Sequence, residues 1–144
     1  MSEGLDLYQE AIKQMAAAAH GHGQLTSPEG EAKLNNPLCG DRVHIQVALQ
    51  GGRIAGLAHQ TKGCLLCRAA ASLLGARAIG LDGAAVGDIT QALEAILGEQ
   101  APAPERWPEL AMFGPAHAYP SRHKCALLPF YALQAALREA GAAK

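Results

Sequence analysis

Hydrophobic and polar residues alternate strictly over residues 43–50, which read VHIQVALQ. A period of two is typical of a strand that buries one face and turns the other toward solvent. The glycines at 51–52 suit a tight turn, and residues 53–60, RIAGLAHQ, have the composition of a second strand. The pattern therefore predicts an antiparallel hairpin.

Apolar residues spaced three and four apart, as on one face of a helix, predict helices elsewhere in the chain. The predicted helices cover residues 5–19, 64–81, 86–97 and 125–141. Cys64 falls in the first turn of the second of these helices, because Gly63 ends the preceding strand. Pro129 is expected in the first turn of the last helix, where proline is tolerated.

Two segments show neither the alternation of a strand nor the three- and four-residue spacing of a helix. Glycines and a proline in 20–36 predict a loop, or a loop that holds a short edge strand. Prolines recur in 98–124 and predict an irregular excursion on the surface. We expect Trp107 and Tyr119 to be packing residues of this excursion.

The composition is that of a folded protein with little net charge. Of the 144 residues, 49% are hydrophobic and 17% are charged, so a single domain over 1–144 can bury a core without disulfides. A net charge of −1 provides no basic field for phosphates, so nucleic acid is not an expected partner. The first residues are acidic, and Arg77 and Asp82 interrupt the most apolar stretch. We therefore expect a cytoplasmic protein with no membrane span.

Three of the four cysteines share one predicted local setting. Cys39 lies in a turn before a strand, Cys64 in a turn after the hairpin, and Cys125 in a turn before the last helix. In a reducing compartment such cysteines indicate metal or reactive sulfur chemistry rather than disulfides. Side chains at the edges of regular structure can converge on one pocket, and Asp41, two residues after Cys39, can add an oxygen.

Three thiolates and one carboxylate form a ligand set that suits tetrahedral zinc or an iron–sulfur cluster. Around a zinc dication, four anionic ligands leave a net negative charge, which Arg122 and Lys124 beside the third cysteine would offset. A hard oxygen ligand holds a borderline-soft metal less firmly than a fourth thiolate does. The set therefore favours exchange of the metal.

Three segments carry a resemblance to a known family. NNPLCGD (35–41), TKGCLLCRAAASLLGARAIG (61–80) and PSRHKCALLPFYALQAAL (120–137) are similar to the signature segments of the IscU/NifU N-terminal family, the U-type iron–sulfur cluster assembly proteins. The 61 residues from Cys64 to Cys125 and the RHKCA pattern are more similar to the SufU branch than to the shorter IscU scaffolds.

The resemblance implies a fold, a site and a partner. The fold is α+β, a small antiparallel β-sheet covered by helices, as in SufU and IscU. The partner is a PLP-dependent, SufS-like cysteine desulfurase that delivers persulfide sulfur, and a downstream iron–sulfur scaffold or apoprotein receives the product. The residues that the resemblance places around one metal are Cys39, Asp41, Cys64 and Cys125.

Two functions from different classes stay open. The chain is a zinc-dependent sulfurtransferase, with Cys39 as the sulfur acceptor and Cys125 as the second choice, or it is a scaffold. On a scaffold, Cys39, Cys64 and Cys125 would hold iron or a transient [2Fe–2S] cluster. Gly40 favours Cys39 as the acceptor because glycine permits loop movement. A structural zinc domain that only binds partners is a third interpretation.

Simpler roles compete for several residues. Cys67 is expected to be a small buried hydrophobe, with relay of sulfur as the alternative. His123 is expected to be solvated or hydrogen-bonded rather than a reserve ligand. His20 and His22 are expected to be surface residues rather than a metal-binding pair. Asp41, if it binds no metal, would cap a turn.

Overall fold

A three-stranded antiparallel sheet with the strand order β1–β2–β3 forms one side of the protein. The structure is a computed structural model that describes residues 10–37 and 40–141. The central strand buries Val43, Ile45 and Val47, as the alternation predicted. The strands are β1 (Gly30–Asn36), β2 (Asp41–Gln50) and β3 (Arg53–Lys62).

The β2–β3 hairpin turns at two glycines. Gly51 and Gly52 have φ angles of 61° and 78°, the left-handed backbone that a two-residue primed turn requires and that glycine adopts most readily. The resulting register places Arg42 directly opposite Lys62 at the other end of the hairpin. The predicted antiparallel pairing is confirmed, and the edge strand predicted as one alternative within 20–36 is β1.

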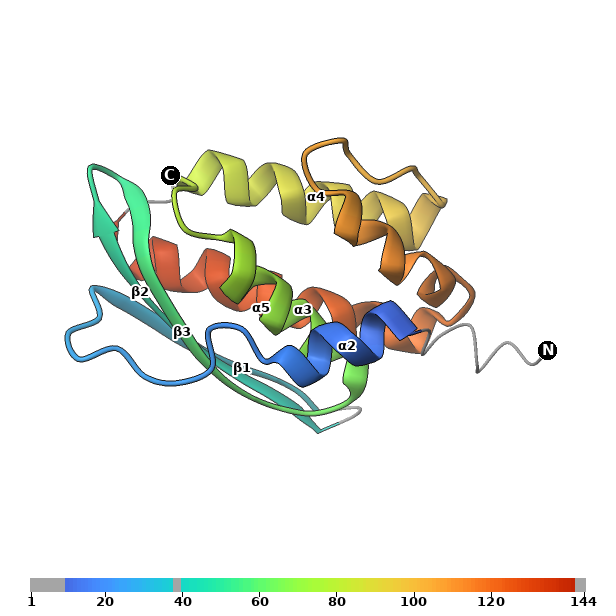
Figure 1. Ribbon diagram of the computed structural model, residues 1–144, viewed down its shortest axis with the longest axis horizontal. Helices are drawn as coiled ribbons and strands as arrows, with labels where there is room; N and C mark the ends of the chain where they lie inside the picture. Colours follow the sequence, from blue (N-terminus) through green and yellow to red (C-terminus); the bar gives the residue numbers. More distant parts are fainter. Residues whose placement is uncertain (1–9, 38–39, 142–144) are drawn as a thin grey trace.

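Helices cover one face of the sheet (Figure 1). Helix α5 contacts β1 and β2, α3 contacts β3, and α2 packs on α3, while α4 and η1 pack on α5. In the part of the chain that the structure describes, none of the helices combines the length and apolar character of a bilayer span. The predicted α+β fold is confirmed. The helices are α2 (Glu10–Ala18), α3 (Leu65–Arg77), α4 (Gly83–Glu99), the 3-10 helix η1 (Pro108–Ala118) and α5 (Pro120–Glu139).

Helix α3 lies at the centre of the core. All residues from Ala69 to Leu74 are fully buried, because α2, α5 and β3 surround the helix. A helix that is covered on several sides needs small and apolar residues around its circumference, and this sequence supplies them. Since Cys64 stands directly before α3, the most enclosed helix of the fold fixes the position of one candidate ligand.

Two helix boundaries differ from the prediction because backbone or capping contacts intervene. The helix predicted over 64–81 ends at Arg77, since the chain beyond it bonds to β3: Ile54 donates its N–H to the Leu81 carbonyl at 2.8 Å. Helix α4 begins before residue 86, at Gly83, because the Asp82 side chain caps it by accepting the N–H of Ala85 at 2.8 Å.

The last helix begins at Pro120, earlier than predicted. Cys125 therefore lies inside α5 and not in a turn before it, and Pro129 lies in the helix interior and not in the first turn. The prediction was wrong because PSRHK has a loop-like composition, yet its proline is favourable at the first position of a helix. Since Pro129 has no N–H, the Cys125 carbonyl receives no helical hydrogen bond from residue 129.

The excursion predicted at 98–124 contains the end of α4, the helix η1 and the start of α5, so the prediction of an irregular segment was largely wrong. Trp107 is buried, as expected of a packing residue, and Tyr119 packs against the core. The Arg77 guanidinium lies 4.7 Å from the centroid of the Trp107 ring and pairs with Glu109. These long-range contacts, which no local pattern contains, hold the segment on α3.

Candidate metal centre

Asp41 is the first residue of β2, and only 1% of its surface is exposed. A buried carboxylate needs hydrogen bonds or a cation. Oδ1 of Asp41 accepts the backbone N–H of Cys64 at 3.0 Å, and Oδ2 lies 3.6 Å from the Cys64 Sγ, which donates to it. These two contacts join the start of β2 to the start of α3.

Gly63 makes this close approach possible. A Cβ at position 63 would lie 2.3 Å from Oδ1 of Asp41 and 2.7 Å from its Cγ, so any side chain here would displace the carboxylate. The sequence pattern predicts no role for Gly63 beyond ending a strand. The available signal was a glycine directly before a cysteine at the start of a helix.

Cys64 is the N-cap residue of α3 and is partly exposed. A hydrogen bond with the Cys125 side chain is the largest cause that lowers the pKa of the Cys64 thiol, from 9.0 to about 7. Backbone groups of Cys67 and Leu66 lower it further, whereas burial and the charge of Asp41 act in the opposite direction. A thiol with this pKa is about half thiolate near neutral pH, and the thiolate is the form that binds metals and attacks disulfides.

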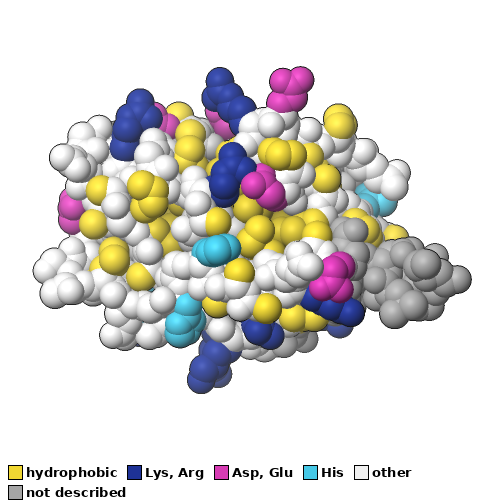
Figure 2. Space-filling view, viewed as in Figure 1, with side chains coloured by type: hydrophobic (Ala, Val, Ile, Leu, Met, Phe, Trp, Pro, Cys, Tyr) yellow, Lys and Arg dark blue, Asp and Glu magenta, His cyan; other side chains and the backbone are white. Residues whose placement is uncertain are grey.

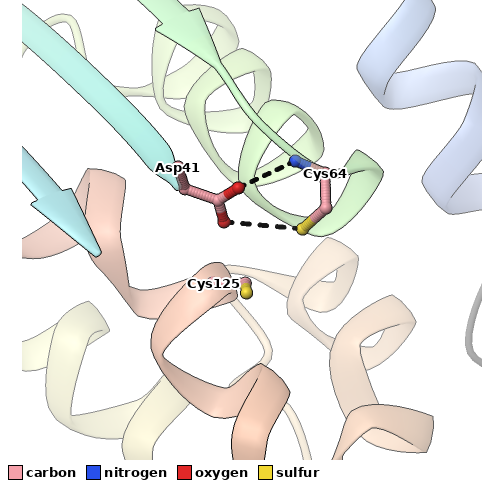
Figure 3. A group of neighbouring side chains, drawn as sticks. All are labelled: Asp41, Cys64 and Cys125. Atoms are coloured by element: carbon pink, nitrogen blue, oxygen red, sulfur yellow. Dashed lines mark hydrogen bonds between the residues drawn. The ribbon is translucent and has the colours of Figure 1, made fainter. Parts of the chain in front are cut away.

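Cys125 completes a cluster of three candidate ligands. Its side chain is fully buried on α5, and one ligand atom each from Asp41, Cys64 and Cys125 lie within 4.8 Å of one another. Figure 3 shows the three side chains converging from β2, the start of α3 and α5. Ligands of one zinc ion lie about 2.0–2.3 Å from the metal, so a spacing of this size is compatible with a shared ion.

Cys39 lies outside the described residues, and its position relative to the cluster is not assigned. The next residue, Gly40, has a φ of 76°, a left-handed backbone that favours glycine. Its N–H donates to the carbonyl of Asn36, the last residue of β1, at 2.7 Å. Strand β2 begins at the next residue, Asp41.

The three residues before Cys125 occupy the first turns of α5. Lys124 is exposed, and Arg122 is partly buried. His123 donates from Nε2 to the carbonyl of His117 at 3.1 Å and stacks on the His117 ring, with 6.4 Å between the centroids. His123 is thus hydrogen-bonded, as expected, and is not among the clustered ligand atoms. The charge-offsetting role of Arg122 and Lys124 stays a prediction.

The remaining highlighted residues have structural contacts. Cys67 is fully buried in the hydrophobic core, as expected. His20 and His22 are exposed, also as expected. His59, on β3, is buried: its Nε2 donates to the His20 carbonyl at 2.8 Å, and its Nδ1 accepts from Thr61 at 2.9 Å.

The sequence pattern predicts a strand at His59 but not its bond to His20.

The sequence matches one protein family over most of its length. Residues 7–126 match the family described as NifU-like N terminal domain. The chain is also similar to a protein of Streptococcus pyogenes serotype M1 named iron-sulfur cluster assembly scaffold protein IscU. The two are 29% identical over 141 residues, which are 96% of this chain and 87% of the relative.

Solved structures agree with this match. A NifU-like protein (N-terminal) from Brucella abortus has a TM-score of 0.92 and 30% identity, with 97% of this chain and 98% of the other covered. The putative scaffold protein for the SUF system from Fervidobacterium islandicum AW-1 has a TM-score of 0.82 and 23% identity, with 92% and 98% covered, and it supports the fold. The chain therefore belongs to the NifU-like N-terminal domain family, the U-type iron–sulfur cluster assembly proteins that its three cysteine segments resemble.

Proposed function

We propose that this protein acts in iron–sulfur cluster assembly as a zinc-bound sulfur acceptor that works with a PLP-dependent cysteine desulfurase. The observation that carries the proposal is the convergence of the Asp41 carboxylate with the Cys64 and Cys125 thiols within 4.8 Å. Two sulfurs and one oxygen form a donor set that suits zinc and that leaves a position for a further ligand.

The proposed ligands are Asp41, Cys64 and Cys125, with Cys39 as the fourth. Cys39 is two residues from Asp41 in the chain, and the left-handed Gly40 separates them. Bound zinc supplies positive charge that keeps thiols deprotonated and guards them against oxidation. The proximity of the buried Asp41 carboxylate to the Cys64 thiol, whose pKa is lowered, supports binding of a cation at this point.

The transfer step uses thiol–disulfide exchange chemistry. The Cys39 thiolate attacks the terminal sulfur of the persulfide on the desulfurase, and a new sulfur–sulfur bond forms on Cys39. The sulfur–sulfur bond on the desulfurase breaks, and its cysteine leaves as a thiolate. The exchange converts one persulfide and one thiolate into one thiolate and one persulfide, so it needs no external oxidant or reductant. A downstream scaffold or apoprotein then receives the sulfur.

Burial argues against Cys125 as the acceptor. Cys125 is completely buried on α5, so a persulfide of another protein reaches it only if helices move. Cys64 is partly exposed, but it is fixed at the N-cap of α3 and is held by Asp41. We propose Cys39 because glycine at the next position, Gly40, permits movement of the chain beside it. We propose that Arg122 and Lys124 offset the negative charge of the ligands from α5.

A second candidate function is a scaffold that assembles a transient [2Fe–2S] cluster. The name of the Streptococcus pyogenes relative, an iron–sulfur cluster assembly scaffold protein, favours this alternative. Iron and sulfide would then be the cargo of the same cysteines, and the Asp41 oxygen would make the cluster easier to release, since a carboxylate binds iron less firmly than a thiolate does.

Metal analysis of the untagged protein, purified in air, separates these functions. We expect about one tightly bound zinc per chain, and we expect the zinc-loaded protein to increase the turnover of a cysteine desulfurase, measured as alanine formed from cysteine. Stoichiometric iron with absorbance at roughly 420 nm, together with unchanged desulfurase turnover, would contradict the sulfur-transfer proposal and favour the scaffold.

Replacement of Asp41 separates both functions from a purely structural zinc site. Asp41→Ala should fold and keep zinc through the thiolates, but with faster metal exchange and altered sulfur transfer. Asp41→Asn keeps an acceptor for the Cys64 N–H and controls for that hydrogen bond. Asp88→Ala, which removes an exposed carboxylate from α4, should change neither property. Unfolding of both Asp41 variants would favour a structural role.

A further inference from the structure

Three cations lie on the sheet face that the helices do not cover. Lys33, Arg42 and Lys62 are exposed, and each comes from a different strand. Together with Leu34, Asn35, Val43, His44 and Gln60 they line one hollow of about 430 Å³. We call Lys33, Arg42 and Lys62 the cationic sheet face. Figure 2 shows lysine and arginine side chains along the lower rim of the molecule, the side on which the sheet lies in Figure 1.

Two of these cations are placed in direct opposition. Arg42 and Lys62 are cross-strand partners in the β2–β3 register, and Lys33 lies diagonal to Arg42 because it pairs with His44. Like charges at directly opposite positions destabilise a sheet. The acidic residue of β1, Glu31, bonds to His44 at 2.6 Å rather than to one of these cations. Among the described residues, none of the three side chains has an ion pair or a hydrogen bond.

The cationic sheet face lies at the end of the sheet nearest the candidate metal centre. Arg42 follows Asp41 directly, and Lys62 comes two residues before Cys64. At the other end, the loop before β1 covers the sheet: Leu25 donates its N–H to Oε1 of Gln46 at 2.8 Å. The loop before β1 therefore covers the outer face of the sheet far from the candidate metal centre. Beside the centre, this face is exposed and positively charged.

We propose that the cationic sheet face is a docking surface for an acidic segment of a partner protein that comes to the metal centre. Neighbouring strands lie about 4.8 Å apart, so three cations on three strands spread over about 10 Å and do not converge on one point. This spread suits a row of carboxylates better than one small anion. Three cations on a chain with a net charge of −1 are a small footprint for nucleic acid. The inference rests on the proposed function only for the claim that a protein visits this site.

Binding of a fluorescent hexaglutamate peptide tests the inference. The zinc-loaded full chain should bind this peptide at low salt. The double variant Lys33→Gln/Lys62→Gln should raise the dissociation constant about fivefold, since each exposed charge pair contributes up to about 1 kcal/mol. Lys13→Gln/Arg138→Gln removes the same charge from exposed positions on α2 and α5 and should change the constant less than about twofold. Equal weakening by both double variants, or no binding of hexaglutamate to the wild type, would overturn the inference.

Competition and folding measurements complete the test. Inorganic phosphate or duplex DNA that displaces the peptide at lower concentration than free hexaglutamate does would assign the face to phosphates and overturn the inference. Circular dichroism confirms that each variant folds. Peptide binding needs no sulfur transfer, so the two proposals fail in different ways. Unchanged desulfurase turnover would contradict the proposed function. Equal peptide binding by the two double variants would contradict the docking surface.

Discussion

The carboxylate of Asp41 and the backbone N–H of Cys64 form a 3.0 Å hydrogen bond between the first residue of β2 and the N-cap of α3. This bond ties the candidate oxygen ligand of Asp41 to the backbone of the candidate sulfur ligand, Cys64. It holds the two donors close together before any ion arrives, which reduces the ordering that binding requires.

Gly63→Ala should disrupt this arrangement. The new Cβ would lie 2.3 Å from Oδ1 of Asp41, so the carboxylate has to move away. As in Asp41→Ala, we expect the thiolates to keep the zinc but to release it faster than in the wild type, and we expect the free energy of unfolding to fall by about 1–3 kcal/mol. The rate of zinc loss to a chelator and urea unfolding measure the two effects.

Gly87→Ala is the matched control, because a Cβ at this position in α4 meets no atom within 4 Å. Alanine in a helix interior is favoured over glycine by roughly 0.5–1 kcal/mol, so this variant should be slightly more stable and fully zinc-loaded. A wild-type rate of zinc loss from Gly63→Ala would show that the position of the Asp41 carboxylate is not critical for metal binding.

Alkylation of the metal-free protein should report the low pKa of the Cys64 thiol. Since the hydrogen bond from the Cys125 side chain is the main cause that lowers this pKa to about 7, the rate of modification by iodoacetamide should rise with a midpoint near that pH. Peptide mass mapping assigns the rate to Cys64. Cys125→Ala should shift the midpoint to higher pH, and an unchanged midpoint would contradict the assigned cause.

Cys67→Ala separates the buried hydrophobe from a sulfur relay. Because Cys67 is completely buried in the core, removal of its sulfur should lower the free energy of unfolding by about 1–2 kcal/mol. Zinc content and sulfur transfer should stay at wild-type values. Mass spectrometry of the sulfur-loaded wild type checks the same point, since a persulfide on Cys67 would contradict the structural role.

Relief of the repulsion on the outer sheet face should stabilise the fold. Lys62→Gln removes one of two like charges in a direct cross-strand pair, and we expect the free energy of unfolding to rise by about 0.2–1 kcal/mol. Lys62→Glu should raise it at least as much, because it faces Arg42 with the opposite charge. Lys13→Gln should leave stability within about 0.5 kcal/mol of the wild type. Urea unfolding at low salt provides the comparison.

The stability of the protein should depend on the protonation of His59. Burial is the main cause that lowers the pKa of His59 below 6.5, with a further contribution from the charge of His22, while the hydrogen bond to the His20 carbonyl raises it. Between the lowered pKa and 6.5, the unfolded chain binds more protons than the native protein, so the free energy of unfolding rises with pH. The stabilisation is present above pH 6.5 and is lost as the pH falls through the lowered pKa.

Urea unfolding across this pH window measures the effect, and His59→Gln should flatten the pH dependence. His22→Gln, at an exposed position, serves as the control and should largely keep it. An NMR titration of His59 with a midpoint at or above 6.5 would refute the prediction directly.

Local patterns in the sequence predicted the β2–β3 hairpin and the existence of helices α3, α4 and α5, although not all of their ends. The alternation that buries Val43, Ile45 and Val47 and the helical spacing around Leu73 are short-range signals that the tertiary structure preserves. Family resemblance, rather than periodicity, supplied the fold class and the ligand candidates. The convergence of Asp41, Cys64 and Cys125 needed coordinates, because no local pattern contains a distance between β2, α3 and α5.

The errors have a common physical origin. Prolines in 98–124 predict a loop from composition alone, although Pro120 begins helix α5 and Pro108 begins η1. The contacts that stabilise this region, such as Arg77 with Trp107, join residues 30 positions apart in the chain. A composition-based prediction has no access to them.

The proline at position 129 has a consequence for the sulfur one turn before it. A helix normally resists local opening because each carbonyl accepts a hydrogen bond from the N–H four residues later. Pro129 has no N–H, so this bond to the Cys125 carbonyl is missing in α5. Cys125 therefore lies in a turn of α5 that lacks one backbone hydrogen bond. If the proposed ion binds there, this missing bond lowers the cost of a small shift of the Cys125 thiol toward the ion.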